Sequence, residues 1–278
     1  MKRIMAWLCV LMMLMPCALA EEVENQTKSE NQAKSENQAK PEDQMKSEEQ
    51  TKSELRGYQK GEGYVYVTLG QCPQDADGGI EPILWRVLSV EDGKAYLLSE
   101  YVLEARPIHS DYQEYANKPT NKKKPGFDGD FTKTEMSIYL CGEFAENCFT
   151  EEERAMLTPH EEFGLFFLAS SADLKNKSYG FTDNESRKAW GTAYALANGL
   201  FKYGSQRGGH SPYWTRTQST TDARHACCTK SKGELGRINV ITLDEGMRPA
   251  CLLNISSAVI SGGSGTKDDP YTLALAED

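Results

Sequence analysis

The sequence predicts an α+β domain: an antiparallel sheet with flanking helices, preceded by a disordered N-terminal repeat. Three observations support this prediction. Runs of β-branched and aromatic residues occupy the first and last parts of the domain, helical patterns occupy its middle, and residues 25–54 repeat a polar hexapeptide. Strands followed by helices and then strands again favour antiparallel pairing over alternating βαβ units.

The first twenty residues predict a cleavable signal peptide. Lys2 and Arg3 form a positive start, residues 4–15 are apolar, and small residues precede a cleavage site near Ala20. The apolar run is shorter than the roughly 20 residues that cross a bilayer. We therefore expect a secreted or cell-envelope-associated protein, with no transmembrane segment in the mature chain.

Residues 21–56 predict a disordered spacer made of hexapeptides such as NQAKSE. They contain almost no apolar side chains, so burial cannot offset the entropy lost on ordering them. Two interpretations stay open: a spacer that holds the domain away from a surface, or a solubilising tail without specific contacts.

Residues 57–256 predict the folded domain, which opens with strands. The segments 64–69, 82–90 and 94–101 are rich in β-branched and aromatic residues. A short turn of Glu, Asp and Gly separates the last two, which predicts a hairpin.

The middle of the domain predicts helices. Thr134 is placed to cap one helix, and Thr150 with Glu153 forms the pattern of a capping box for another. Residues 162–170 have the length of a strand, and residues 186–200 predict a further helix.

The domain closes with predicted strands over 213–217, 237–243 and 247–253. Residues 257–278 predict a Gly- and Ser-rich C-terminal tail, a mobile linker that ends in a short strand.

Six cysteines remain after cleavage of the signal peptide, and an even number in an exported chain predicts disulfides. Sequence alone does not choose among the pairings, although Cys141 and Cys148 are the nearest non-adjacent pair and the first expectation. The candidates are Cys72, Cys141, Cys148, Cys227, Cys228 and Cys251.

An ordered set of motifs supports a resemblance. The set is ILWRVL, AYLLSEYVLE, MSIYL with FTEEERAML, GLFFLAS, TAYALANGL, YWTRT and GMRPACLLN. With it, residues 64–254 resemble an uncharacterised family of exported bacterial domains, a domain of unknown function. The YWTRT and GMRPA segments are similar to the closing strands of the C-type-lectin-like group, which includes formylglycine-generating enzymes. The resemblance implies that fold and no particular reaction.

Composition and motifs argue against several functions. A net charge of −10 disfavours nucleic acid, which is bound by displacing counterions with Lys and Arg. No phosphate-binding loop, nucleophile elbow or paired metal-binding histidine motif occurs. We therefore expect no catalytic residues, no metal and no cofactor.

Two groups of residues keep the alternatives open. Acidic turns at Asp75/Asp77 and Asp128/Asp130 offer oxygen ligands of the kind calcium takes, although the EPN and QPD triplets of sugar-binding lectins are absent. His225, Cys227 and Cys228 form the densest set of nucleophiles and soft ligands, and would be the centre of a cysteine- or metal-dependent enzyme.

The candidate binding residues are Tyr213, Trp214, Arg216 and Arg248. An aromatic side chain beside an arginine can form a binding platform. The competing interpretation is that Trp214 is a core residue and that the arginines are structural, paired with carboxylates.

The expected function is therefore a non-enzymatic binding or adhesion module at the bacterial cell envelope. Its partner would be a glycan or a surface protein. The alternatives are the exported enzyme centred on His225, Cys227 and Cys228, or a surface protein with no discrete ligand.

Overall fold

The computed structural model describes residues 49–51, 53–110, 130–204, 209–219 and 224–277. The predicted signal peptide and most of the predicted repeat lie outside these residues. Within them, no helix is both long and apolar enough to cross a membrane. The described part is a mixed α+β structure made mostly of sheet, which confirms the predicted class.

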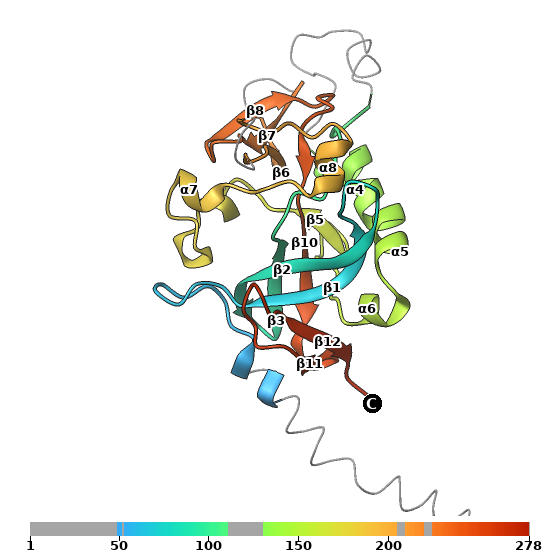
Figure 1. Cartoon of the computed structure of the whole chain (residues 1–278), viewed down its shortest axis with the longest axis vertical. Helices are drawn as coiled ribbons and strands as arrows, with labels where there is room; N and C mark the ends of the chain where they lie inside the picture. The colour runs from blue at the N-terminus through green and yellow to red at the C-terminus, as the bar shows by residue number, and fades with distance from the viewer. Residues whose placement is uncertain (1–48, 52, 111–129, 205–208, 220–223, 278) are drawn as a thin grey trace, which may run out of the picture. The chain divides into compact units, whose positions relative to one another are not determined.

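The larger of two sheets has seven strands and forms the base of the fold (Figure 1). From one edge to the other, its strands are β11 (Ala258–Gly262), β12 (Tyr271–Leu275), β1 (Tyr66–Pro73), β2 (Ile80–Glu91), β3 (Lys94–Ser99), β10 (Pro249–Asn254) and β5 (Phe166–Leu168). All neighbours are antiparallel except β1 and β12, which are parallel.

The predicted hairpin is confirmed as β2 and β3. Glu91 pairs with Lys94 across the turn. Asp92 and Gly93 both have positive φ, at 50° and 73°. Asp followed by Gly is the preferred sequence for a two-residue turn of this kind, because both positions require left-handed backbone.

The smaller sheet has five strands and lies above the larger one in the view of Figure 1. In order, its strands are β4 (Glu104–Ala105), β9 (Gly246–Met247), β6 (Tyr213–Gln218), β7 (His225–Thr229) and β8 (Leu235–Asn239). Tyr213 pairs with Gly246 in parallel, and the other pairs are antiparallel. The cysteine-rich segment forms strand β7, although no strand was predicted there.

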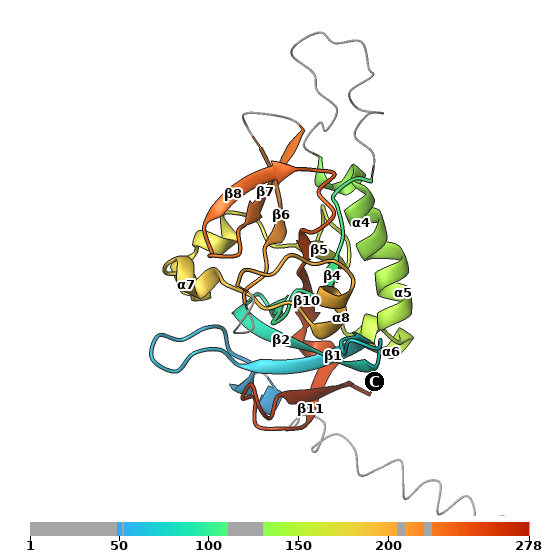
Figure 2. The ribbon, with the colours of Figure 1, turned by 45° about the horizontal axis from the view of Figure 1, so that its top comes forward.

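A column of short helices runs along one side of the sheets (Figure 2). Its members are η1 (Phe131–Lys133), α4 (Glu135–Tyr139), η2 (Leu140–Phe144), α5 (Ala145–Cys148) and α6 (Glu151–Ala155). Both predicted caps are confirmed. Thr134 accepts a hydrogen bond from the Ser137 amide, and Thr150 with Glu153 forms the capping box.

Aromatic side chains join this helical column to one face of the larger sheet. The ring of Phe166 on β5 lies 4.4 Å from that of Phe149 and 5.3 Å from that of Phe144. The indole of Trp85 on β2 packs against the same group, 6.4 Å from Phe149. Rings at these separations add to the stabilisation that their burial gives.

The predicted helix over 186–200 is interrupted. It divides into α7 (Asn184–Arg187) and α8 (Ala193–Ala197), and residues 188–192 between them are extended. The extended segment forms bridges from Ala189 to Ser211 and from Gly191 to Val102. Tertiary pairing overrides the helical pattern here. Two short turns, η3 (Asp173–Lys175) and η4 (Lys177–Tyr179), precede α7.

Residues at both borders of the predicted domain belong to its core. Leu55, within the predicted spacer, is only 2 % exposed. The predicted mobile tail contains β11 and β12, and the short turn η5 (Ile255–Ser257) leads into it. Strand β12 pairs with β1, and Gly263 and Gly265, with φ of 83° and 72°, form the turn that returns the chain to the sheet.

The cysteines differ from expectation. All six are free thiols in the described residues, so the predicted disulfides are not present. Cys141 and Cys148 are not bonded to each other in the structure. The Cys141 sulfur lies 3.3 Å from the carbonyls of Phe163 and Phe166, whereas the thiol of Cys148 interacts with that of Cys72.

Candidate functional site

One face of the larger sheet carries a cluster of charged side chains. Arg86 on β2 pairs with Leu98 on β3, and Leu98 pairs with Ala250 on β10. Paired and alternate residues of a sheet share a face. Glu100 lies two residues after Leu98, and Arg248 lies two residues before Ala250, so both project on the same side as Arg86.

Glu100 is the only carboxylate among the ion pairs of this cluster and is 2 % exposed. It accepts a hydrogen bond of 2.7 Å from Arg86 Nε and one of 2.8 Å from Lys267 Nζ. Burial alone would raise the pKa of Glu100. The charges of Arg86, Arg248 and Lys267 outweigh it and hold that pKa below its usual value. The carboxylate is therefore ionised at neutral pH, and its ion pair with Lys267 connects that exposed lysine to the core.

Arg248 lies deeper and is 1 % exposed. Its Nε donates to the Ser99 carbonyl at 2.8 Å, and its guanidinium lies 5.0 Å from the centre of the Tyr213 ring. Neither of its terminal nitrogens has a hydrogen-bond partner among the described residues. Burial, together with the nearby Arg86, lowers the pKa of Arg248. Three cations thus gather around one carboxylate, and the local charge is positive in an acidic chain.

Aromatic rings lie over these cations on the side that leads to solvent. The Arg86 guanidinium lies 4.6 Å from the centre of the Tyr64 ring. The Lys267 ammonium lies 5.2 Å from the ring of Tyr101 and 5.9 Å from that of Trp190. These contacts are within the range of cation–π attraction, which holds the rings and cations in fixed relative positions.

Trp190 presents its indole to solvent from a fixed backbone. Its side chain is 41 % exposed. Its carbonyl accepts a hydrogen bond of 2.9 Å from the Val102 amide, and the next residue forms a bridge to Val102. The ring of His210 lies 4.4 Å from the indole. We call the group of exposed Trp190 and Lys267 with half-buried Tyr101 the Trp190 surface.

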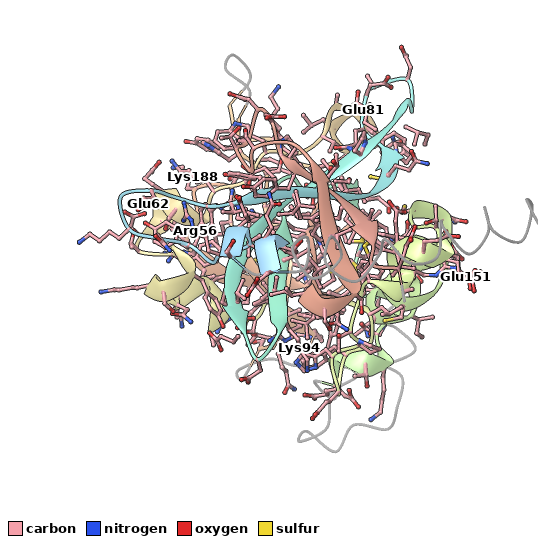
Figure 3. All side chains as sticks on the ribbon, turned by 90° about the horizontal axis from the view of Figure 1, so that it is seen from below. Arg56, Glu62, Glu81, Lys94, Glu151 and Lys188 are labelled. Carbon is pink, nitrogen blue, oxygen red and sulfur yellow. The ribbon has the colours of Figure 1, made fainter. Side chains whose placement is uncertain are left out.

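A cleft of about 550 Å³ adjoins this surface at Lys267. Its lining includes Arg56 and Glu62, which form an ion pair of 2.9 Å and are both labelled in Figure 3. The lining also includes Tyr64, Tyr66, Ser264, Thr266, Lys267 and Tyr271. Pockets for apolar small molecules are lined mainly by hydrophobic side chains. The hydroxyl, carboxylate and cationic groups here suit a hydrophilic ligand.

The structure distributes the four predicted binding residues over different places. Tyr213 and Trp214 are buried, and they donate hydrogen bonds of 2.7 and 2.8 Å to the carbonyls of Arg187 and Arg106. Tyr213 lies against Arg248, whereas Trp214 and Arg216 project from the opposite face of β6. Binding roles for these residues stay a prediction.

Arg216 lines a second cleft, of about 480 Å³, together with Asp130, Thr132, Glu162 and Phe163. It forms an ion pair of 2.9 Å with Asp173 and donates a hydrogen bond of 2.6 Å to the Leu168 carbonyl. Its guanidinium is thus held by groups of the domain itself, as expected of a structural arginine.

On the cysteine-rich strand β7, the thiol of Cys228 is not activated. Cys228 is buried, and burial, followed by the nearby Glu245, raises the pKa of its thiol. A raised pKa disfavours the reactive thiolate. Cys227 projects from the other face of the strand, where its sulfur lies 3.4 Å from the Gln218 carbonyl.

The acidic turns considered for calcium have local structural roles. Asp75 accepts hydrogen bonds from the amides of Asp77 and Gly79, at 2.9 and 2.6 Å. Asp130 caps η1, and Asp128 lies outside the described residues. Within the part of the chain that the structure describes, no three His, Cys, Asp or Glu side chains gather in a way that could hold a metal ion.

Sequence reasoning missed the main residues of the site. Trp190 falls in a segment with a helical pattern, and only its pairing with distant residues fixes it in an extended segment. Lys267 lies in the predicted tail, 167 residues from its partner Glu100. No local pattern signals such a pair.

One of the three comparisons with known proteins found a match. No curated protein and no solved structure is significantly similar to the chain. A family model described as "Domain of unknown function (DUF6273)" matches residues 92–255, from the β2–β3 turn to the end of β10. The match includes Glu100, Trp190 and Arg248, and it leaves out β1, β12 and Lys267. Because it covers more than half of the chain, the protein belongs to this family of domains of unknown function.

Proposed function

We propose that this protein is an exported, non-enzymatic binding module of C-type-lectin-like fold at the bacterial cell envelope, and that it binds a glycan on the Trp190 surface and in the adjoining cleft. The observation that carries the proposal is the exposed indole of Trp190, beside a lysine anchored on a buried carboxylate. Export is supported by the N-terminal signal pattern, and the lectin-like fold by the closing-strand motifs.

Sugar rings have apolar C–H faces and polar hydroxyl edges, and the surface offers a partner for each. The rings of Trp190 and Tyr101 provide flat apolar area with few rotatable bonds. Lys267 and the cleft residues Tyr66 and Thr266 provide hydrogen-bonding groups. The excess of cations around Glu100 favours a sugar that carries a carboxylate, because opposite charges attract most strongly where solvent is partly excluded.

The surface is also preorganised. Lys267 carries an ion pair to buried Glu100, and Trp190 is held through the main chain on both sides. Side chains that are fixed before binding lose little entropy when a ligand arrives. A rigid platform of this kind suits retention of a ligand.

The enzyme alternative at His225, Cys227 and Cys228 has less support. The pKa of Cys228 is raised by burial and by Glu245, so its thiolate would be scarce at neutral pH.

The test is retention of the mature chain on an array of neutral and carboxylate-bearing glycans. We expect selective retention of a carboxylate-bearing glycan and a loss of at least roughly tenfold in affinity for Trp190→Ala. The matched control is Ile138→Ala on α4, which removes another exposed apolar side chain, 65 % exposed, away from the surface. An equal loss in both variants, or no retention across the array, would overturn the proposal.

A second pair of variants tests the charge. Lys267→Gln is expected to weaken binding of the carboxylate-bearing glycan more than that of a neutral analogue. Lys94→Gln is the control, since Lys94 is exposed at the start of β3, next to the β2–β3 turn (Figure 3). Equal weakening of both glycans would argue against contact between Lys267 and a carboxylate.

A further inference from the structure

Two cysteines lie on elements that pack directly against each other. Cys72 is near the end of β1, and Cys148 is the last residue of α5. Around them, the Gly70 amide donates a hydrogen bond of 2.9 Å to Glu153, and the Phe149 ring fills the space where a side chain at position 70 would lie. These contacts hold the end of β1 against the end of α5 independently of the cysteines.

The two thiols are buried and interact with each other. Cys72 is 5 % exposed and Cys148 is 8 % exposed. The interaction with Cys148, followed by burial, raises the pKa of Cys72, and the interaction with Cys72 lowers that of Cys148. Cys148 is also slightly more exposed than Cys72, so an external disulfide reaches it first.

The other four cysteines have different neighbours. Cys141 contacts two main-chain carbonyls, and the pKa of Cys228 is raised by burial and by the nearby Glu245. Cys227 lies against the Gln218 carbonyl, and the pKa of Cys251 is raised by burial alone. Cys72 and Cys148 are thus the two of the six described cysteines that lie on different elements and interact with each other.

We propose that Cys72 and Cys148 form a disulfide by exchange with an external disulfide, and that this bond joins β1 to α5. The Cys148 thiolate attacks one sulfur of the donor disulfide, which releases one donor thiolate and leaves a mixed disulfide. Cys72, after losing its proton to solvent, attacks the Cys148 sulfur and releases the second donor thiolate. Two electrons pass from the cysteine pair to the donor, which ends as two thiols.

The test uses the mature full-length chain, reduced and then equilibrated with a mixture of oxidised and reduced glutathione. Free thiols are alkylated, and the peptides are mapped by mass spectrometry without reduction. We expect one cross-linked peptide pair, joining Cys72 to Cys148, with the other four cysteines alkylated. Six alkylated cysteines, or a bridge between any other two, would overturn the proposal.

Stability provides a second readout. Closing a loop of this length restricts the unfolded chain, so oxidation is expected to raise Tm by on the order of 10 °C. Cys72→Ala and Cys148→Ala should each abolish the shift, whereas Cys141→Ala should retain it. A shift that survives loss of Cys72 would show that another pair is responsible, and mapping of the unsubstituted chain decides the question if a variant fails to fold.

Discussion

At the scale of single residues, the charged cluster depends on Glu100. This carboxylate is buried and accepts hydrogen bonds from both Arg86 and Lys267, while Arg248 adds a third positive charge nearby. A cation that is buried without a counter-charge is costly, because the interior does not replace the water it has lost. Changes at Glu100 should therefore affect folding as well as binding.

Glu100→Gln should reduce the free energy of unfolding by about 3–5 kcal/mol, because it leaves Arg86 buried without its charged partner. Urea denaturation followed by circular dichroism measures this loss. Glu81→Gln is the control, since Glu81 is exposed on β2 and should change stability by less than about 0.5 kcal/mol. Similar stabilities for Glu100→Gln and the unchanged protein would show that the cluster does not hold the core.

Glu245 predicts a pH dependence. Burial raises the pKa of this carboxyl from 4.5 to about 7, and it is 3 % exposed. Between those pH values the folded protein keeps a proton that the unfolded chain loses. The free energy of unfolding should therefore fall as pH rises from about 4.5 to about 7, by roughly 3 kcal/mol from this residue.

Glu245→Gln removes this titration and keeps the size of the side chain. We expect the variant to gain stability relative to the unchanged protein as pH rises through that window, with the difference constant above it. Urea midpoints at a series of pH values measure the difference. A difference that does not vary with pH would mean that Glu245 titrates normally.

At the scale of elements, the end of β1 fits closely against the helical column. Gly70 has φ of 70°, and its missing side chain leaves room for the ring of Phe149. Gly61 also has a positive φ, of 96°, but nothing lies within 4 Å of the place a Cβ would take. A side chain added at Gly61 would therefore cause backbone strain alone, whereas one added at Gly70 would cause both strain and steric overlap.

Gly61→Ala should cost about 1 kcal/mol, from strain alone. Gly70→Ala carries the same strain and must also displace Phe149, which should bring its cost to about 2–4 kcal/mol. Thermal unfolding of the two variants compares them directly. Equal costs would contradict the close fit between β1 and Phe149.

Elements with local signals were predictable, and those set by distant partners were not. Thr134 and Thr150 cap helices through hydrogen bonds within three residues, and the β2–β3 turn is set by its own two residues. The extended segment at Trp190 depends on Val102 and Ser211, which are remote in sequence. Its helical composition therefore misled the prediction, and the main part of the candidate site was missed with it.

At the scale of the whole molecule, the ends of the domain meet in the larger sheet. Strand β12 pairs with β1, Ile260 donates to Thr51 at 3.1 Å, and the Tyr271 hydroxyl is hydrogen-bonded to Glu54. Composition marked residues 257–278 as a tail because Gly and Ser are frequent there. The pairing that makes them part of the sheet joins residues about two hundred positions apart, which no local pattern reveals.

Truncation at residue 256 tests this arrangement. It removes β11, β12 and Lys267, and leaves β1 as an unpaired edge. We expect a lower Tm and a tendency to aggregate, because unpaired edges recruit other chains. Deletion of residues 25–45, within the predicted repeat, is the control and should leave Tm unchanged. Scanning calorimetry and light scattering measure both effects, and an unchanged Tm after truncation would contradict a structural role for the C-terminal strands.

The parallel pairing of β1 with β12 also determines how the domain would respond to a pulling force. A load applied to the two ends of the chain draws β1 and β12 in opposite directions along their length. The hydrogen bonds between parallel strands then carry the load together and do not open one after another. This geometry resists extension, and optical tweezers with handles at the two ends would measure its strength.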